Sequence, residues 1–432
     1  MERVTEMKKV EDVVIVGGGI CGLATAVALK RVGIDAVVLE RAETLRTTGT
    51  SITLASNAWL ALDALGVSHK LSRLYSPLTR STVINVSNGA VQQISFPQAD
   101  KGRQVAPKAV HRKALMQALA EELPIKNIHF SCKITSISTE LDIQGSSIAV
   151  LLMEDGTYIK TKVLIGCDGV HSRVARWLGL GEPVNSGRSA VRGLSIFPQG
   201  HQYDHDFTRF VDVSFNGAFV PLTDTELFWG LVIGNSAPLE HRDIAATTPA
   251  ESIQRDIKEH HCKDFPKVYL DVVSHLDLST LTWGPLKLRL PWNVIFGNLN
   301  KGTITVAGDA MHPMTPDLGQ GGCSALEDAV VLGRCIGESY LKNERQLVSS
   351  EVAKAIDDYV KERRWRVAGL IAASFVSGWM QDGSSWLKRF IRNAIFYRIF
   401  RQYFSNITNY DCGKLPKISS CSPESNSRNK ID

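Results

Sequence analysis

Three glycines and one glutamate early in the chain have the spacing of a site that holds a dinucleotide. Gly17, Gly19 and Gly22 form a G-x-G-x-x-G pattern between an apolar run and an alanine-rich stretch, and Glu40 closes the next apolar run. Glycines at these positions permit a tight turn and bring the backbone close to a pyrophosphate, while the acidic residue accepts hydrogen bonds from a ribose. The pattern predicts a β-α-β unit that binds a dinucleotide, but it does not distinguish NAD from FAD.

Two aspartates follow apolar runs further along the chain. Asp168 stands in a Gly-Cys-Asp-Gly sequence after one run, and Asp309 follows Gly308 before a loop rich in proline and glycine. Each run leads into a stretch of helical character, so both aspartates are expected at the ends of buried strands. An ionised carboxylate at a strand end is well suited to accept hydrogen bonds from the hydroxyl groups of a ligand.

These three motifs together resemble those of the FAD-dependent aromatic-hydroxylase-type monooxygenases, the family that includes p-hydroxybenzoate, salicylate and urate hydroxylases. The similarity covers roughly residues 10–375 and is strongest to the plant monooxygenases of that group. The third motif carries most of it: Gly308-Asp309-Ala310-Met311-His312-Pro313 is followed by Pro316, by Gly319-Gln320-Gly321-Gly322 and by Leu326-Glu327-Asp328-Ala329. The resemblance implies that the dinucleotide is FAD.

The resemblance also implies roles for individual residues. Asp309 would accept a hydrogen bond from the ribitol chain, and the turn at 319–322 would direct backbone N–H groups at the pyrimidine edge of the isoalloxazine. Arg112 would reach FAD from the start of a helix, and Arg41 would approach the adenosine ribose or phosphate. The predicted FAD-binding residues are Gly17, Gly19, Gly22, Glu40, Arg41, Thr53, Arg112, Ile134, Asp168, Asp309, Pro316, Gly319, Gly321 and Gly322.

NADH or NADPH is the electron donor that the resemblance implies. The family usually has an arginine seven residues after the aspartate of the second motif, where this chain has Ala175 followed by Arg176. A shift of one residue turns a helical side chain by about 100°, which leaves the donor preference open. Only one complete G-x-G-x-x-G is present, which favours the hydroxylase type over reductases with a second nucleotide-binding domain. The W-x-W-x-I-P element of flavin halogenases is missing.

The order of the predicted elements favours an α/β fold. It has a doubly wound, Rossmann-like FAD-binding domain, an inserted mixed β-sheet substrate domain and a helical C-terminal segment. We expect a discontinuous FAD domain at 10–75, 102–183 and 290–345, and a substrate domain at 76–101 and 184–289. Residues 346–405 form the C-terminal helical segment, and 406–432 are expected to be a disordered tail.

Composition and charge exclude several classes of function. The formal net charge is +5 and no dense block of lysine and arginine is present, which argues against a nucleic-acid partner. The eight cysteines show no CxxC and no histidine at metal-ligand spacing, so we expect no metal site and a cytoplasmic protein without a disulfide framework. Residues 386–404 combine aromatic and basic residues; core packing is favoured there, with weak peripheral membrane contact as the alternative.

The sequence therefore predicts a single-component flavoprotein monooxygenase. As the resemblance implies, NAD(P)H reduces FAD, O2 forms the flavin C4a-hydroperoxide, and one oxygen atom passes to a small aromatic or heteroaromatic substrate. Two alternatives stay open: epoxidation of an apolar isoprenoid-like substrate, and FAD binding without catalysis. No catalytic side chain is identified, and His312 is expected to stabilise its loop. Candidate pocket residues, most of which alternation places in the sheet core, are Arg192, Arg209, Phe219, Phe228 and Trp229.

Overall fold

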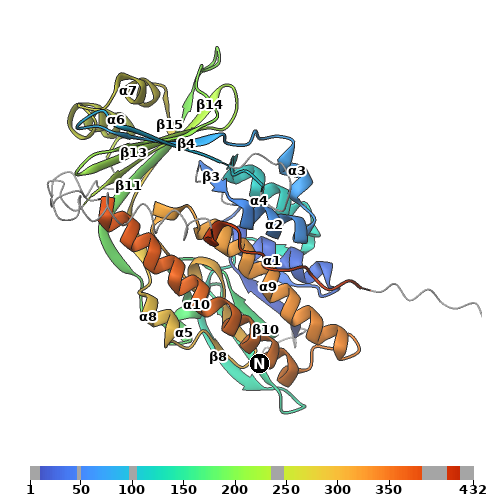
Figure 1. The fold of residues 1–432 in the computed structure, drawn as a ribbon. Helices are drawn as coiled ribbons and strands as arrows, with labels where there is room; N and C mark the ends of the chain where they lie inside the picture. The colour runs from blue at the N-terminus through green and yellow to red at the C-terminus, as the bar shows by residue number, and fades with distance from the viewer. Residues whose placement is uncertain (1–9, 46–49, 97–104, 235–247, 382–405, 419–432) are drawn as a thin grey trace, which may run out of the picture.

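The computed structural model describes residues 10–45, 50–96, 105–234, 248–381 and 406–418. Two large β-sheets organise these residues (Figure 1). The sheet at the upper left of the figure carries α6 and α7 on its outer side, and the other sheet lies among α1, α9 and α10. The chain enters both sheets more than once, so each is assembled from separated stretches of sequence.

The eight-stranded sheet is built around β1 (Glu11–Val16) and β10 (Tyr158–Gly166), which pair in parallel. The last four residues of both strands are buried, as expected for parallel strands covered by helices. Strands β17, β10, β1, β2 and β7 are mutually parallel, so their carboxyl ends share one edge. The strand order is β16 (Asn300–Lys301), β17 (Ile304–Val306), β10, β1, β2 (Val37–Leu39) and β7 (Ile128–His129), with β9 (Ser147–Met153) joining β10 to β8 (Ile134–Leu141).

Helices α1 (Ile20–Arg31), α9 (Gly321–Lys342) and α10 (Ser349–Gln381) form the main helical layer of this region (Figure 1). Small residues let α1 and α9 approach closely, because a Cβ on Gly333 would lie 2.5 Å from the Cβ of Ala28. Helix α10 packs against the other side of α9. The shorter helices of the region are α2 (Ser56–Leu65), α3 (Ser68–Ser72), α4 (Arg112–Ala120), α5 (Arg173–Trp177) and α8 (Pro291–Ile295), with single turns η1 (Ile125–Asn127), η4 (Gly308–Ala310) and η5 (Pro316–Leu318).

The seven-stranded sheet shows the alternation that the sequence predicts. In β14, Leu227, Trp229, Leu231 and Ile233 are buried, whereas the residues between them are half-buried. The buried face packs against α6 (Ala250–Asp256), the π-helical turn η3 (Ile257–His261) and α7 (Lys267–Ser274). The strand order is β15 (Leu276–Leu288), β11 (Val184–Ile196), β14 (Glu226–Ile233), β13 (Phe215–Pro221), β12 (Phe207–Val211), β4 (Arg80–Asn85) and β5 (Val91–Ser95).

A two-stranded sheet of β3 (Ser51–Leu54) and β6 (Lys108–His111) completes the strands of the described ranges. The domain boundaries given above stay a prediction, although β4 and β5 do join the strands of 184–288 in one sheet. Within the described residues, no helix is long and apolar enough to cross a bilayer. The same stretches contain no group of three or more His, Cys, Asp or Glu residues that could hold a metal ion.

The 406–418 segment corrects one expectation. These residues were predicted to belong to a disordered tail, yet Ile407 and Cys412 are only 4% and 1% exposed. Ile407 lies in an apolar cluster with Leu318 and Leu370, so a few anchors hold a segment whose overall composition is polar. Residues 386–404, with their two interpretations, and the tail beyond 418 lie outside the described residues.

Candidate flavin site

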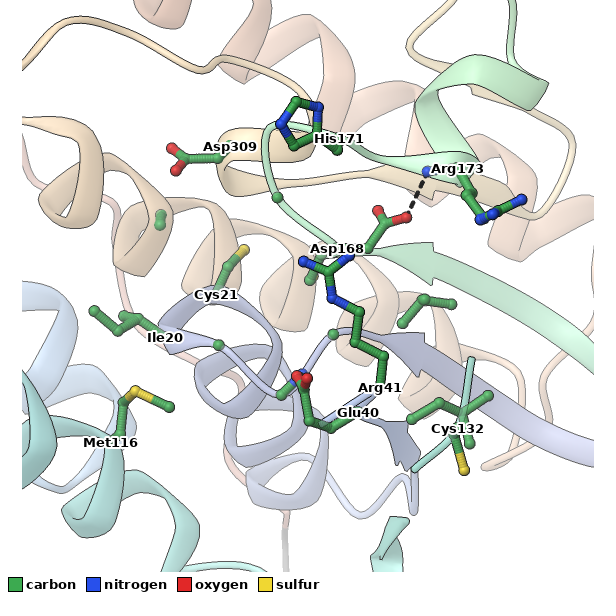
Figure 2. Close-up of a pocket in the computed structure, with 18 of the residues that line it drawn as sticks. Ile20, Cys21, Glu40, Arg41, Met116, Cys132, Asp168, His171, Arg173 and Asp309 are labelled. Carbon is green, nitrogen blue, oxygen red and sulfur yellow. Dashed lines mark hydrogen bonds between the residues drawn. The ribbon is translucent and has the colours of Figure 1, made fainter. Parts of the chain in front are cut away.

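A recess of about 320 Å³ lies at the carboxyl edge of the eight-stranded sheet (Figure 2). The residues that follow β1, β2, β10 and β17 all line it, together with the first residues of α9. Parallel strands bring their carboxyl ends to one edge, which explains why residues so distant in sequence meet here.

The glycine turn between β1 and α1 forms one wall of the recess. Gly17 has φ +106°, and a Cβ there would lie 2.4 Å from the carbonyl oxygen of Cys167. A Cβ on Gly22 would lie 1.9 Å from the carbonyl oxygen of Gly17, so this glycine lets α1 start directly behind the turn. A Cβ on Gly19 would meet no atom within 4 Å, and Gly19 lines the recess. Gly17 and Gly22 are required by the turn itself, whereas Gly19 leaves open space at the N-terminus of α1.

Glu40 stands directly after β2 and its carboxylate is held by the backbone. Its Oε2 accepts a hydrogen bond of 2.7 Å from the N–H of Gly18, and its Oε1 accepts one of 2.9 Å from Ala42. The side chain is therefore fixed toward the glycine turn, with lone pairs left for a ligand hydroxyl. Arg41 follows it and also lines the recess (Figure 2).

Asp168 follows β10 and carries an unsatisfied oxygen. Its Oδ2 accepts a hydrogen bond of 2.7 Å from the N–H of Arg173, the dashed line in Figure 2. Its Oδ1 is buried and has no partner among the described residues. Burial raises the pKa of Asp168, and hydrogen bonds from Ser172 and Arg173 counteract only part of that effect. A buried oxygen without a partner is costly, so this atom fits a site completed by a polar ligand.

Asp309 follows β17 and faces the start of α9 across the recess. Its carboxylate is exposed and makes no hydrogen bond to any described residue, and its Oδ1 lies 4.0 Å from the position of a Cβ on Gly321. Gly319 ends the preceding turn with φ +63°, which favours glycine. The backbone N–H groups of Gly321 and Gly322 open α9 and have no partner in the preceding helical turn. A carboxylate and free N–H groups thus face one space.

Arg112 and Ile134 line the recess from other elements. Arg112 is the first residue of α4, and its Nε is buried without a hydrogen-bond partner among the described residues. Ile134 begins β8. The unsatisfied Asp168 oxygen, the unsatisfied Arg112 nitrogen and the open space at Gly19 all fit a large group that carries phosphates and hydroxyls.

The family described as the FAD binding domain matches residues 11–374 of this chain. The chain belongs to that family. Monooxygenase 2 of Arabidopsis thaliana is 39% identical over 414 residues, which cover 94% of this chain and 98% of that protein. The FAD-dependent urate hydroxylase of Mycolicibacterium vanbaalenii is 30% identical over 328 residues, 74% of this chain and 78% of that protein.

Solved structures share the fold. Klebsiella pneumoniae HpxO in complex with FAD and uric acid superposes with a TM-score of 0.76 at 23% identity, covering 93% of this chain and 98% of that one. The fold class and the family resemblance predicted from the sequence are therefore confirmed. The chain is an FAD-dependent monooxygenase, and FAD is its cofactor.

The recess of this monooxygenase gathers ten of the fourteen residues that the sequence predicts to bind FAD. Gly22 lies behind the turn, Thr53 pairs with Ala109 in the small sheet, and Pro316 and Gly319 belong to the turn before α9; these four do not line the recess. The ten that line it are Gly17, Gly19, Glu40, Arg41, Arg112, Ile134, Asp168, Asp309, Gly321 and Gly322. Their contacts with FAD stay a prediction.

Several lining residues escaped the sequence reasoning. Cys21, Met116, Ile52 and His171 carry no motif of their own, and only their position beside a motif residue could have indicated them. The structure shows where the side chains at 175–176 lie. Ala175 is buried, and the Nε of Arg176 donates to Glu182 at the surface over 2.7 Å. Arg173 is the arginine of α5 that lines the recess.

His312 supports its loop, as predicted. Its ring is fully buried, and its Nε2 donates a hydrogen bond of 2.5 Å to Oδ2 of Asp328. It does not line the recess.

The seven-stranded sheet has a second face, opposite the one that packs against α6 and α7. Across that face the register places Arg192 beside Gly230, Gly230 beside Ala218, and Ala218 beside Arg209. The neighbouring row contains Leu194, Phe228 and Val220, which pack in one apolar cluster. Phe219 and Trp229 point to the opposite face and are core residues, as expected for most of the candidate pocket residues.

Arg192 connects this face to the recess. Its guanidinium makes no hydrogen bond or ion pair with any described residue, and the residue is exposed to solvent. Burial lowers the pKa of Arg192, the charge of Arg112 lowers it further, and the charge of Asp309 raises it. The guanidinium of Arg192 is therefore partly desolvated and lies within electrostatic reach of two recess residues, Arg112 and Asp309.

Proposed function

We propose that this monooxygenase works with a single protein component: NADH or NADPH reduces FAD in the recess, and one oxygen atom of O2 passes to a small aromatic or heteroaromatic substrate. Substrate, O2, NAD(P)H and a proton yield hydroxylated substrate, NAD(P)+ and water. The bound FAD supplies this chemistry, with O2 activated at its C4a atom, while the protein binds, orients and excludes water. The observation that supports the proposal is Arg192, a residue of the seven-stranded sheet that is close enough to Asp309 and Arg112 of the recess for their charges to shift its pKa.

We further propose how the phosphate and adenosine end of FAD is held. The pyrophosphate lies at the N-terminus of α1, over the open space at Gly19, where the tight turn at Gly17 directs free backbone N–H groups. Glu40 accepts hydrogen bonds from the ribose hydroxyls, because its carboxylate is already oriented by two backbone N–H groups. Arg41 approaches the adenosine ribose or phosphate.

At the flavin end, Asp309 accepts a hydrogen bond from the ribitol chain. The N–H groups of Gly321 and Gly322 face the pyrimidine edge of the isoalloxazine, where a helix N-terminus stabilises the negative charge of reduced flavin. Asp168 and Arg112 complete the polar wall, and each gains a partner for an atom that is buried and unsatisfied. Ile134 contributes a backbone contact from the wall of the recess, whereas Thr53 supports the wall from the small sheet.

The substrate lies between the recess and the seven-stranded sheet. The half-buried side chains of Leu194 and Phe228 offer an apolar surface for a planar ring, and the unpaired guanidinium of Arg192 offers a charge-assisted hydrogen bond to an acidic substituent. An aromatic acid or acidic heteroaromatic compound matches both features.

The test is to purify the protein, record its visible spectrum and follow NADH or NADPH oxidation together with O2 consumption. We expect a bound FAD spectrum and oxidation that phenolic acids accelerate, with hydroxylated product formed. Acceleration by polyenes but not by phenolic acids would replace this proposal with epoxidation of an apolar substrate. A flavin that no donor reduces would contradict both.

A further inference from the structure

Two arginines on α10 hold two adjacent carboxylates on α9. Arg363 Nε donates to Oδ1 of Asp328 over 2.6 Å, and its Nη1 lies 2.7 Å from Oε2 of Glu327. Arg366, one turn further along, donates to both oxygens of Glu327 over 2.6 and 2.7 Å. The side chains of Arg363, Glu327 and Asp328 are fully buried.

Each carboxylate continues toward the loop at residues 308–320, which precedes α9 and is here called the 308–320 loop. Asp328 Oδ2 accepts hydrogen bonds from the N–H of Gly308 over 2.8 Å and from His312 over 2.5 Å. It thereby fixes the start of the loop, next to Asp309.

Glu327 reaches the other end of the same loop. Its Oε1 accepts a hydrogen bond of 2.5 Å from Nδ2 of Asn57, and the same nitrogen donates to Oε1 of Gln320 over 2.9 Å. Gln320 occupies the N-cap position of α9, immediately before Gly321, and is only 2% exposed. The path from Arg366 to Gln320 therefore consists of three side chain contacts, all buried or nearly so.

The 406–418 segment closes the network from the outside. Arg366 Nη2 also donates to the carbonyl oxygen of Ile407 over 2.9 Å, and its guanidinium lies 3.9 Å from the ring centroid of Tyr410. The Ile407 side chain packs with Leu318 of the 308–320 loop. The segment thus touches the loop directly through an apolar contact and indirectly through Arg366.

We propose that Arg366, held by the 406–418 segment, is a positioning residue for the flavin ring: it fixes Glu327 and so the Asn57–Gln320 pair that sets where α9 begins. This rests on the proposed placement of the isoalloxazine against Gly321 and Gly322. Buried ion pairs are a poor way to gain stability, since desolvation offsets much of their attraction, but they impose one geometry because no partner can move without stranding a charge.

The first test uses Arg366→Gln in the full-length enzyme, with Arg334→Gln as the matched control. Arg334 also bridges α9 and α10, through Glu362, but its connection to Arg366 runs only through the hydroxyl group and ring of Tyr410 and includes no direct hydrogen bond to Glu327. We expect Arg366→Gln to weaken FAD binding about tenfold, as loss of one charge-assisted hydrogen bond would, and to change the visible circular dichroism of bound flavin. Arg334→Gln should leave the FAD Kd and the spectrum unchanged.

Tyr410 distinguishes the ring contact from its hydroxyl group. Tyr410→Phe loses the 3.0 Å hydrogen bond to Glu362 but keeps the ring over Arg366, so its flavin spectrum should match the wild type. Tyr410→Ala should shift the spectrum in the direction seen for Arg366→Gln. Tyr410→Ala, with Tyr410→Phe as its control, probes the network if Arg366→Gln does not fold.

A double-mutant cycle decides the proposal. Gln320→Met removes the far end of the path at constant volume, and its effect on FAD Kd should not add to that of Arg366→Gln, because one path carries both. Additive effects, or an Arg366→Gln enzyme with wild-type FAD Kd and spectrum, would overturn the inference. A wild-type enzyme that binds no FAD would instead overturn the proposed flavin placement.

Discussion

The two sheets of this monooxygenase present polar side chains in different ways. In the eight-stranded sheet they stand at strand ends and in glycine turns, as Glu40, Asp168 and Asp309 do. In the seven-stranded sheet they stand in the middle of strands, as Arg192 and Arg209 do on β11 and β12. The backbone fixes the first kind of position, whereas the second depends on which residues face the same side in neighbouring strands.

This difference suggests a division of roles. Strand ends and glycine turns have a backbone geometry that tolerates few substitutions, which suits a cofactor that does not vary. Side chains along a strand face can be exchanged without disturbing the ladder, which suits a substrate that differs between relatives. Substitutions at the sheet edge should therefore affect FAD binding, and substitutions on the sheet face should affect substrate binding alone.

The largest effect is expected at the glycine turn. Gly19 has φ −80° and ψ −174°, which valine adopts readily, and its Cβ would meet no protein atom. Gly19→Val should therefore fold normally but weaken FAD binding at least about a hundredfold, because the side chain displaces a phosphate from two or more hydrogen bonds. FAD titration and the melting temperature of FAD-free protein measure the two parts.

Substitutions of two other glycines serve as controls for Gly19→Val. Gly284, in β15, is also surrounded by open space, so Gly284→Val should leave FAD binding unchanged. Gly22→Val would place its Cβ 1.9 Å from the Gly17 carbonyl oxygen and should lower the melting temperature as well as FAD affinity. If Gly19→Val retains a full complement of FAD, the phosphates do not lie at this turn.

Asp309 gives the next largest effect. Its carboxylate has no partner among the described residues, so Asp309→Ala should not destabilise the FAD-free protein. FAD binding should weaken about tenfold, the value of a hydrogen bond to a charged group, as measured by flavin fluorescence during titration. Asp309→Asn, which keeps an acceptor, should recover part of the affinity. Equal FAD affinity in all three proteins would remove Asp309 from the site.

The sheet edge could be predicted from the sequence because spacing alone encodes it. The glycine turn and the strand-end carboxylates are local patterns, and parallel pairing brings them together without further information. The face of the seven-stranded sheet could not be predicted to the same extent. Alternation separates Phe228 from Trp229, but only the observed register puts Arg192 and Arg209 in one row with Gly230 and Ala218 between them.

Two further features were beyond the sequence for physical reasons. Residues 406–418 are polar in composition, and their order comes from tertiary contacts of Ile407, Tyr410 and Cys412 that no local pattern announces. The sequence shows that Arg176 stands one residue beyond the usual position of the arginine after the second motif, but it does not show which way the Arg176 side chain points. The structure shows Arg176 paired with Glu182 at the surface.

Substitution of Arg192, on the face of the seven-stranded sheet, tests whether changes there affect substrate binding alone. Arg192→Gln should raise the KM for a phenolic acid about tenfold, because a charge-assisted hydrogen bond to its carboxylate is lost, while the FAD Kd stays unchanged. The corresponding phenolic amide should lose much less, and Arg192→Lys should recover part of the affinity for the acid. Steady-state kinetics with the acid and amide pair measure this. An equal loss for both compounds, or a loss of FAD, would show that Arg192 does not bind the acidic group.

The smallest effect is expected at two buried carboxylates, Asp168 and Asp328, whose pKa values are shifted in opposite directions. Burial raises the pKa of Asp168 in the FAD-free protein, so its charge costs stability once the pH exceeds the unfolded value of about 4. For Asp328, burial alone would raise the pKa, but His312 and Arg363 outweigh it and lower the pKa to about 2. The ionised form of Asp328 therefore stabilises the fold above pH about 4, and this contribution is lost as the pH falls toward 2.

Asparagine substitutions should therefore act in opposite directions. At pH 7 Asp168→Asn should raise the melting temperature of FAD-free protein by a few degrees, a gain that disappears near pH 4, whereas Asp328→Asn should lower it because Arg363 loses a partner. Thermal unfolding between pH 4 and pH 8 measures both. A lower melting temperature for Asp168→Asn at pH 7 would mean that its carboxylate is already satisfied without FAD. The unsatisfied Oδ1 of Asp168 would then no longer be evidence that FAD binds at the edge of the eight-stranded sheet while the substrate binds at the face of the seven-stranded sheet.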